Sequence, residues 1–231
     1  MSAKGMKSSE ELRDFYAGEY VENYARTHTP IRIERLLKHV HLRRDDAVAD
    51  FACGDGMLMP YVAPRVASYV GVDFSEEFIK KANERRQLLG IQNAEFHAAD
   101  INAFCDGNQN RFDRAFALDF SEHVYDGQWL EILASIRNAL KAGGSLYVHT
   151  PNSLFFVEQM KKHSIFLTQA PQHVAVRSPS ENVELLRKAG FRIERVELTA
   201  HYNPLGALHV LSHIPILGRY FQARIFIDAV K

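Results

Sequence analysis

The chain has 231 residues, and its 28 lysines and arginines balance its 28 aspartates and glutamates, so the formal net charge is zero. Hydrophobic residues make up 46% of the chain and charged residues 24%, which is typical of a soluble globular domain. The balanced charge disfavours a nucleic-acid partner, and no apolar run approaches the roughly 18 residues of a transmembrane segment. A peripheral contact with a membrane surface stays open.

The two cysteines, Cys53 and Cys105, are too few for a disulfide framework, and neither belongs to a Cys-x-x-Cys pair. The first ten residues also lack the apolar core of a secretory signal. Both observations favour a reducing compartment, and we expect a cytoplasmic protein.

Two helices are expected before the first strand. A capping box opens a helix over residues 8–24, and a Thr-Pro pair opens a second helix over residues 29–41. We assign residues 1–42 to an N-terminal helical cap. Tyr16 and Tyr20 fall on one face of the first helix, where they either pack against the domain or contact substrate beneath a lid.

From residue 43 to residue 231 the sequence predicts one α/β domain in which strands and helices alternate. The expected strands are Ala47–Phe51, Tyr69–Val72, Glu95–Ala98, Phe112–Leu118, Ser145–His149, Phe191–Leu198 and Ile225–Val230. Helices are expected over residues 57–67, 75–90, about 129–140 with a Gly-Gly stop at 143–144, and 178–190.

This alternation is typical of a doubly wound, Rossmann-like parallel sheet with helices on both faces. The rhythm changes over about 153–177, which we interpret as an insertion. The last two strands have no crossover of the earlier type between them, so they are expected to form an antiparallel hairpin at the edge of the sheet.

The first strand runs into a turn with very little side-chain bulk. Residues 48–56 read Val-Ala-Asp-Phe-Ala-Cys-Gly-Asp-Gly, with small residues at the alternate positions Ala52, Gly54 and Gly56. Glycine permits the backbone angles of a tight turn and lets a ligand lie against the main chain.

Carboxylates recur at or near the ends of the first four expected strands. They are Asp50 or Asp55, Asp73, Asp100 and Asp119. Ligands of doubly wound sheets bind beyond the carboxyl ends of the strands. Any one of these acids could instead be a helix cap or a turn residue. Four in succession beside a glycine turn favour a nucleoside-binding site, in which Asp55 or Asp119 could hold an ammonium group.

The second and third strand ends supply the nucleoside contacts. Asp73 lies about 20 residues beyond the glycine turn, where a carboxylate can accept both hydroxyls of a ribose, and Phe74 can cover an apolar face. Asp100 can accept the exocyclic amine of an adenine, with the Ile101 side chain against the ring.

The glycine spacing also bears on the kind of cofactor. A dinucleotide site favours Gly-x-Gly-x-x-Gly, whereas the third small residue here comes one position too early. No tyrosine is followed four residues later by a lysine, so the usual pair of short-chain reductases is missing. A cofactor without phosphates suits the sequence better, and a Rossmann oxidoreductase is kept as an alternative.

Taken together, these motifs resemble those of the class I S-adenosylmethionine-dependent methyltransferases. Residues 50–56 match the first motif, Asp/Glu-x-Gly-x-Gly-x-Gly, except that Ala52 takes the first glycine position. Asp73 matches the acid of the second strand, and Asp100 with Ile101 matches the adenine motif. Glu122-His123-Val124 resembles the Glu-His-Val of the quinol and small-molecule O-methyltransferase branch. Residues 112–119, 140–144 and 186–191 resemble the later motifs.

The resemblance implies a seven-stranded sheet with an antiparallel last strand, and S-adenosylmethionine as cofactor. In this family the glycine turn approaches the methionine part of the cofactor, and the Leu118 carbonyl or Asp119 lies near its amine. The implied cofactor residues are Asp50, Ala52, Cys53, Gly54, Gly56, Asp73, Phe74, Asp100, Ile101, Leu118 and Asp119.

The acceptor is predicted to be a small molecule, methylated at a hydroxyl, with nitrogen as the alternative. The sulfonium carbon is already activated, so positioning and proton removal remain for the enzyme. His123 is predicted to be the base or to orient the acceptor, and His173 is a tentative substrate contact. A metal is not expected, since His209 and His213 lack a completing ligand.

Several functional questions stay open at the level of sequence. The apolar segment 205–217 could line an acceptor pocket, form a dimer interface or contact a membrane, so a monomer and a homodimer both remain possible. A protein acceptor and a non-catalytic methyltransferase-like domain are further alternatives.

Overall fold

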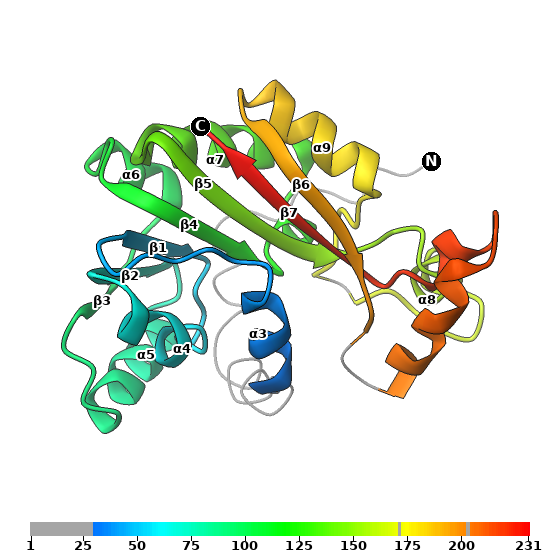
Figure 1. Ribbon diagram of the computed structural model, residues 1–231, viewed down its shortest axis with the longest axis horizontal. Coiled ribbons are helices and arrows are strands. Elements are labelled where there is room, and N and C mark those ends of the chain that lie inside the picture. The colour runs from blue at the N-terminus through cyan, green and yellow to red at the C-terminus, as the bar shows by residue number, and fades with distance from the viewer. Residues whose placement is uncertain (1–29, 171, 202–203) are drawn as a thin grey trace.

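The computed structural model describes residues 30–170, 172–201 and 204–231, and its centre is a seven-stranded sheet of order β3-β2-β1-β4-β5-β7-β6 (Figure 1). The strands are β1 Ala47–Phe51, β2 Ser68–Asp73, β3 Ala94–Ala98, β4 Phe112–Leu118, β5 Leu140–Pro151, β6 Arg192–Thr199 and β7 Arg224–Val230. Strands β1 to β5 pair in parallel, and β7 runs antiparallel to both β5 and β6. The expected doubly wound sheet with an antiparallel last strand is confirmed.

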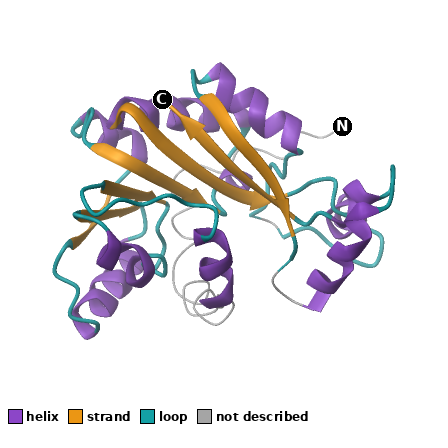
Figure 2. Cartoon of the chain, in the orientation of Figure 1, coloured by secondary structure: helices purple, strands orange, loops and turns teal. Residues whose placement is uncertain are grey.

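Helices cover both faces of this sheet (Figures 1 and 2). Their bounds are α3 Pro30–Leu37, α4 Met59–Val62, α5 Glu76–Leu88, α6 Ile101–Asp106, α7 Asp126–Ala139, α8 Phe156–Lys162 and α9 Pro179–Lys188. Short 3-10 helices are η1 Ala63–Arg65, η2 Ser121–His123, η3 Pro204–His213 and η4 Gly218–Phe221. Helices α3, α4 and α5 lie on one side of the sheet, and α6, α7 and α9 lie on the other.

Each face of the sheet has its own apolar core because side chains alternate along a strand. On the α3 side, Phe116, Tyr147 and Phe226 from three neighbouring strands are buried with Leu36. On the other side the strand residues pack with Trp129 and other apolar residues of α7 and α9. The two cores fix the strand ends, where the predicted site residues lie.

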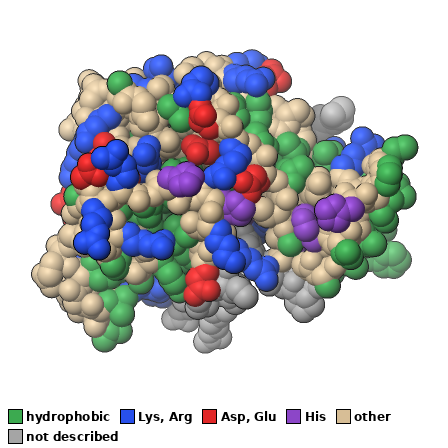
Figure 3. Space-filling model, viewed as in Figure 1, with side chains coloured by type: hydrophobic (Ala, Val, Ile, Leu, Met, Phe, Trp, Pro, Cys, Tyr) green, Lys and Arg blue, Asp and Glu red, His purple; other side chains and the backbone are tan. Residues whose placement is uncertain are grey.

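The insertion is packed at the end of the molecule that carries α8. The Phe156 ring of α8 lies 5.8 Å from the Phe221 ring of η4, so α8 contacts the 3-10 segment that precedes β7. Large apolar side chains are exposed here, among them Phe166 at 95% and Ile216 at 84% (Figure 3). In the described part of the chain, every helix is too short or too polar to cross a bilayer.

Some element boundaries differ from those expected. The helix expected over 29–41 ends at Leu37, and α7 ends at Ala139 rather than at the Gly-Gly pair. That pair lies inside β5, where Leu140 pairs with Phe112 but Ser145 already pairs with Arg114, so the intervening residues bulge out of the ladder. Helix α6 was not expected, since its six residues are too few to show a helical period. The expected helix over 8–24, with Tyr16 and Tyr20, lies outside the described residues.

Candidate active site

The turn after β1 has the conformation that its small residues permit. Ala52, Gly54 and Gly56 have φ angles of 57°, 53° and 73°, in the left-handed region. A Cβ atom at Gly56 would lie 2.9 Å from Cζ of Phe96, so the turn is packed tightly from behind. The N–H of Cys53 donates to the carbonyl of Val72 (3.1 Å), which ties the turn to the neighbouring strand β2.

Asp73, the last residue of β2, faces this turn. Its Oδ2 accepts a hydrogen bond from the N–H of Gly54 (3.0 Å), and its Oδ1 accepts one from the N–H of Ser75 (2.9 Å). Ser75 itself caps α5 by accepting from the N–H of Phe78, so Asp73 is not the helix cap. Burial raises the pKa of Asp73 to about 6, and these amide hydrogen bonds oppose that effect. Each carboxylate oxygen can accept a further hydrogen bond, as ribose hydroxyls would require.

Asp50 lies beneath the turn in a buried position. The hydroxyl of Tyr69 donates to its Oδ2 at 2.5 Å. Burial raises the pKa of Asp50 to about 7, the Tyr69 hydrogen bond lowers it, and the nearby charge of Asp73 raises it. The other acid considered at this strand end, Asp55, forms an ion pair with Arg85 (Nη2 to Oδ2, 2.6 Å).

The third strand end brings the adenine residues close to Asp73. The N–H of Ala99 donates to the carbonyl of Asp73 (2.9 Å), and α6 begins two residues later. Asp100 caps α6 by accepting from the N–H of Ala103 (3.1 Å), so the capping role considered for it is present. Its side chain is nevertheless exposed, whereas Ile101 is buried and Phe74 is half-buried.

A small cavity joins the glycine turn to the end of β4. It is lined from the sheet side by four predicted cofactor residues, Asp50, Ala52, Cys53 and Leu118, together with Met57 and Leu58. Helix α3 forms the opposite wall with Arg32, Ile33 and Leu36. The sequence predicted a helix here as part of a cap over residues 1–42, but it did not single out these three side chains.

Asp119 is the centre of a charged network at the end of β4. Its carboxylate forms ion pairs with Arg32 of α3 and with Arg224 of β7 (2.8 Å), and its Oδ1 lies 3.1 Å from Nδ1 of His149. Its φ is 50°, and its N–H donates to the carbonyl of His149 (2.7 Å). Two guanidinium groups already pair with this carboxylate, whereas Leu118 lines the cavity directly, so Leu118 is the less engaged of the two residues considered for the cofactor amine.

His123 follows on η2 and lies against the insertion. Its Nδ1 is 3.1 Å from the carbonyl oxygen of Gln172, so Nδ1 carries the proton and Nε2 the lone pair. The ring of His173 meets it edge-on with centroids 5.0 Å apart. Burial lowers the pKa of each histidine to about 4, so both are neutral at pH 7. The structure therefore brings together the two histidines that the sequence singled out separately.

Glu122 completes this cluster. Its side chain is 1% exposed and accepts from the hydroxyl of Thr150 (3.1 Å), and burial raises its pKa. Ligand atoms of Glu122, His123 and His173 all lie within 4.8 Å of one another, which one divalent cation could bridge. This grouping was not expected. His209 and His213, the pair considered from the sequence, lie on the 3-10 helix η3.

Over residues 48–144 the sequence matches the family model described as a methyltransferase domain. The chain is a class I S-adenosylmethionine-dependent methyltransferase. It is 25% identical to the ubiquinone biosynthesis O-methyltransferase of Acinetobacter baylyi, covering 76% of this chain and 75% of that one. It is 26% identical to the protein of the same name from Methylococcus capsulatus, covering 81% and 80%.

A solved structure supports the fold of this methyltransferase. Magnesium protoporphyrin IX methyltransferase from Synechocystis, solved with bound S-adenosylhomocysteine, aligns with a TM-score of 0.71 at 16% identity. The alignment covers 97% of this chain and all of that one. The methyltransferase uses S-adenosylmethionine, and its residues fit that cofactor: the bare main chain of the turn faces a buried acid at the next strand end.

Proposed function

We propose that this methyltransferase transfers a methyl group from S-adenosylmethionine to a hydroxyl of a small molecule. The observation that carries the proposal is the neutral, half-buried His123 at the end of β4, held through its Nδ1 by a backbone carbonyl. The curated relatives named above are O-methyltransferases of ubiquinone biosynthesis, which supports oxygen as the acceptor atom. Methylation at nitrogen is the alternative.

The cofactor is assigned to the residues expected from the sequence. We propose that Asp73 accepts the ribose hydroxyls, that Asp100 and Ile101 hold the adenine with Phe74 nearby, and that the turn from Asp50 through Gly56 supports the methionine part. The cofactor amine is assigned to the Leu118 carbonyl, because the carboxylate of Asp119 is paired with Arg32 and Arg224. When bound, the cofactor supplies a methyl group on a positively charged sulfur.

The acceptor proton is assigned to His123. With Nδ1 protonated, Nε2 is the atom that can receive a proton from a hydroxyl. A pKa of about 4 makes this histidine a weak base toward a phenol, so its principal effect is to orient the hydroxyl and accept the proton as the methyl bond forms. His173, in edge contact with it, is proposed to line the acceptor side.

A metal-assisted reaction is the second candidate, and the cluster of Glu122, His123 and His173 favours it. A carboxylate and two imidazoles are a common set of ligands for divalent transition metals. In that case the three side chains would hold the ion, and the ion would lower the pKa of an acceptor hydroxyl.

The experiment compares His123→Ala with the exposed control His163→Ala, using catechol as acceptor. For His123→Ala we expect kcat to fall by about 100-fold or more, with the Kd of S-adenosylhomocysteine unchanged within a few-fold. Unchanged turnover would remove His123 from the mechanism. Treating the wild-type enzyme with EDTA separates the two candidates, since activity lost with the chelator and restored by a divalent cation supports the metal-assisted reaction.

The remaining assignments concern the surroundings of the site. We propose that α3 belongs to an N-terminal cap over residues 1–42. Its residues Arg32, Ile33 and Leu36 line the small cavity between the glycine turn and the end of β4, which we call the cofactor cavity. Cys53 and Cys105 are free and buried, which supports a cytoplasmic location. The exposed apolar side chains near α8 and η3 suit a contact with a second copy or with a membrane surface.

A further inference from the structure

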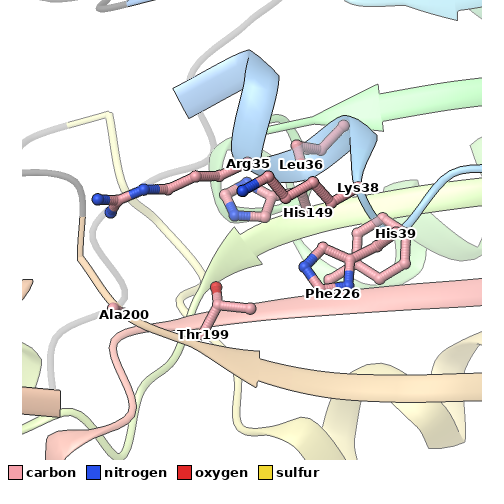
Figure 4. Close-up of a pocket in the computed structure, with 8 residues that line it drawn as sticks. All are labelled: Arg35, Leu36, Lys38, His39, His149, Thr199, Ala200 and Phe226. Atoms are coloured by element: carbon pink, nitrogen blue, oxygen red, sulfur yellow. The ribbon is translucent and has the colours of Figure 1, made fainter. Parts of the chain in front are cut away.

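A second cavity lies on the other side of Leu36, and none of the roles above uses it. Its volume is about 150 Å³. It is bounded by α3 and the residues after it, by the end of β6, and by side chains of β5 and β7 (Figure 4). The lining residues are Arg35, Leu36, Lys38, His39, His149, Thr199, Ala200 and Phe226.

The walls of this cavity differ in polarity. Leu36 and the Phe226 ring supply buried apolar surface. Arg35 and Lys38 extend from α3 and its C-terminal end as exposed cations (Figure 4), and no acid in the described ranges forms an ion pair with either of them. Thr199 adds a hydroxyl from the end of β6.

Two acids contact side chains that line the cavity: Asp119, described above, contacts His149, and Glu197 contacts His39. Glu197, on β6, is paired with His39 and with Arg195 (3.0 Å). Glu197 is therefore already engaged with two side chains of the protein. A ligand entering the cavity meets buried apolar surface, from Leu36 and Phe226, and two exposed cations, Arg35 and Lys38.

The second cavity borders the cofactor cavity. Leu36 lines both of them. Leu118, which lines the cofactor cavity, is the register partner of His149, which lines the second one. Adjacent strands lie ~4.8 Å apart, so the two cavities are separated by about one strand spacing and one leucine side chain. The two cavities are therefore neighbours, and a molecule that extends from the second cavity past Leu36 would reach the cofactor cavity.

We propose that the second cavity anchors the methyl acceptor, and that the acceptor is an aromatic ring carrying an anionic group. A dry cavity of roughly 150 Å³ is enough to hold a benzene ring. Ring atoms pack on Leu36 and Phe226, and a carboxylate or phosphate receives hydrogen bonds from Arg35 and Lys38. This inference rests on the proposed small-molecule methyltransferase function and specifies the class of its acceptor.

The test uses calorimetry on the full chain saturated with S-adenosylhomocysteine. Benzoate, phenyl phosphate and neutral benzamide are the probes, since all three carry the same ring. We expect an anionic probe to bind at least about tenfold more tightly than benzamide. Whichever anion binds more tightly, carboxylate or phosphate, identifies the acidic group of the acceptor.

Three variants test the assignment of the cations. Arg35→Ala and Lys38→Ala are each expected to weaken binding of the preferred anion by about tenfold and to leave benzamide unaffected. Arg44→Ala is the matched control, because Arg44 is an exposed cation shortly after α3 that does not line the cavity. Arg35 and Lys38 are exposed, so both variants should keep the wild-type Tm.

The outcomes separate this inference from the proposed function. If S-adenosylhomocysteine binds but benzamide binds as well as both anions, the anionic anchor is wrong and the methyltransferase proposal stands. The same conclusion follows if Arg44→Ala weakens binding of the preferred anion as much as Arg35→Ala does. If S-adenosylhomocysteine itself does not bind, both are overturned.

Discussion

Replacing the buried Asp50 by asparagine tests the electrostatics of the glycine turn. The side chain is 3% exposed, and its Oδ2 accepts a hydrogen bond from Tyr69. Asparagine has nearly the same shape and keeps an oxygen for Tyr69, but it cannot ionise. The variant therefore removes the cost of a buried charge while leaving the packing in place.

The size of the effect follows from the pKa of Asp50. It is about 7 in the folded protein against an ordinary value of 3.8. An acid with a raised pKa contributes stability that is fully present below pH 3.8 and is lost as the pH rises through about 7. That loss amounts to about 4 kcal/mol at pH 8 and to less than half as much at pH 5.

Thermal unfolding at pH 5 and pH 8 measures this difference. Asp50→Asn should raise Tm, relative to wild type, more at pH 8 than at pH 5, by about 5–10 °C for a domain of this size. Burying the new amide has a cost that does not depend on pH. It changes the Tm difference between variant and wild type equally at pH 5 and pH 8, so it cancels when the two pH values are compared. The exposed Asp106→Asn is the control and should show no such difference. The reasoning is refuted if Asp50→Asn changes Tm equally at both pH values, or loses more stability at pH 8.

Three further predictions concern the turn, the strand end and the loop of His123. Gly56→Ala should weaken S-adenosylhomocysteine binding by about tenfold or more and cost about 1–3 kcal/mol of stability, because of the positive φ and the contact with Phe96; wild-type affinity and Tm would contradict this. The affinity for S-adenosylhomocysteine should fall as the pH decreases through about 6, where Asp73 becomes protonated and loses acceptor capacity; a flat calorimetric profile from pH 5 to 8 would argue against it. Arg177→Met should lower the free energy of unfolding, measured with denaturant, by about 3 kcal/mol and should also lower kcat. The reason is that buried Arg177 donates to the carbonyls of Ser121 and Val124, on either side of His123. An unchanged kcat would show that this support is not needed.

The sequence predicted the parts of the site that depend on local structure. The turn after β1 needs small residues for its left-handed angles, and Asp73 and Asp100 follow directly from where β2 and β3 end. The helix expected from residue 75 is also present, with Ser75 as the cap of α5. These features are readable because each is set by residues within a few positions of one another.

Features built from distant segments could not be predicted in the same way. Asp119 is paired with Arg32 and Arg224, which are more than 80 residues away on either side, so its sequence position alone made it look available for a cofactor amine. The two cavities could not be predicted either. Leu36 of α3 lines both of them, together with Leu118 of β4 in one cavity and His149 of β5 in the other. Sequence indicated that α3 forms, but the packing of its side chains is a tertiary property.

The most direct test of the account is the calorimetric affinity of S-adenosylhomocysteine for wild-type protein and for Asp73→Ala, with the exposed Asp45→Ala as control. The carboxylate of Asp73 is proposed to accept two ribose hydroxyls, so its removal should weaken binding by at least about 100-fold, while Asp45→Ala binds like wild type. An Asp73→Ala variant that retains near-native affinity, or a wild-type protein that binds NAD instead, would contradict a phosphate-free nucleoside lying on the glycine turn.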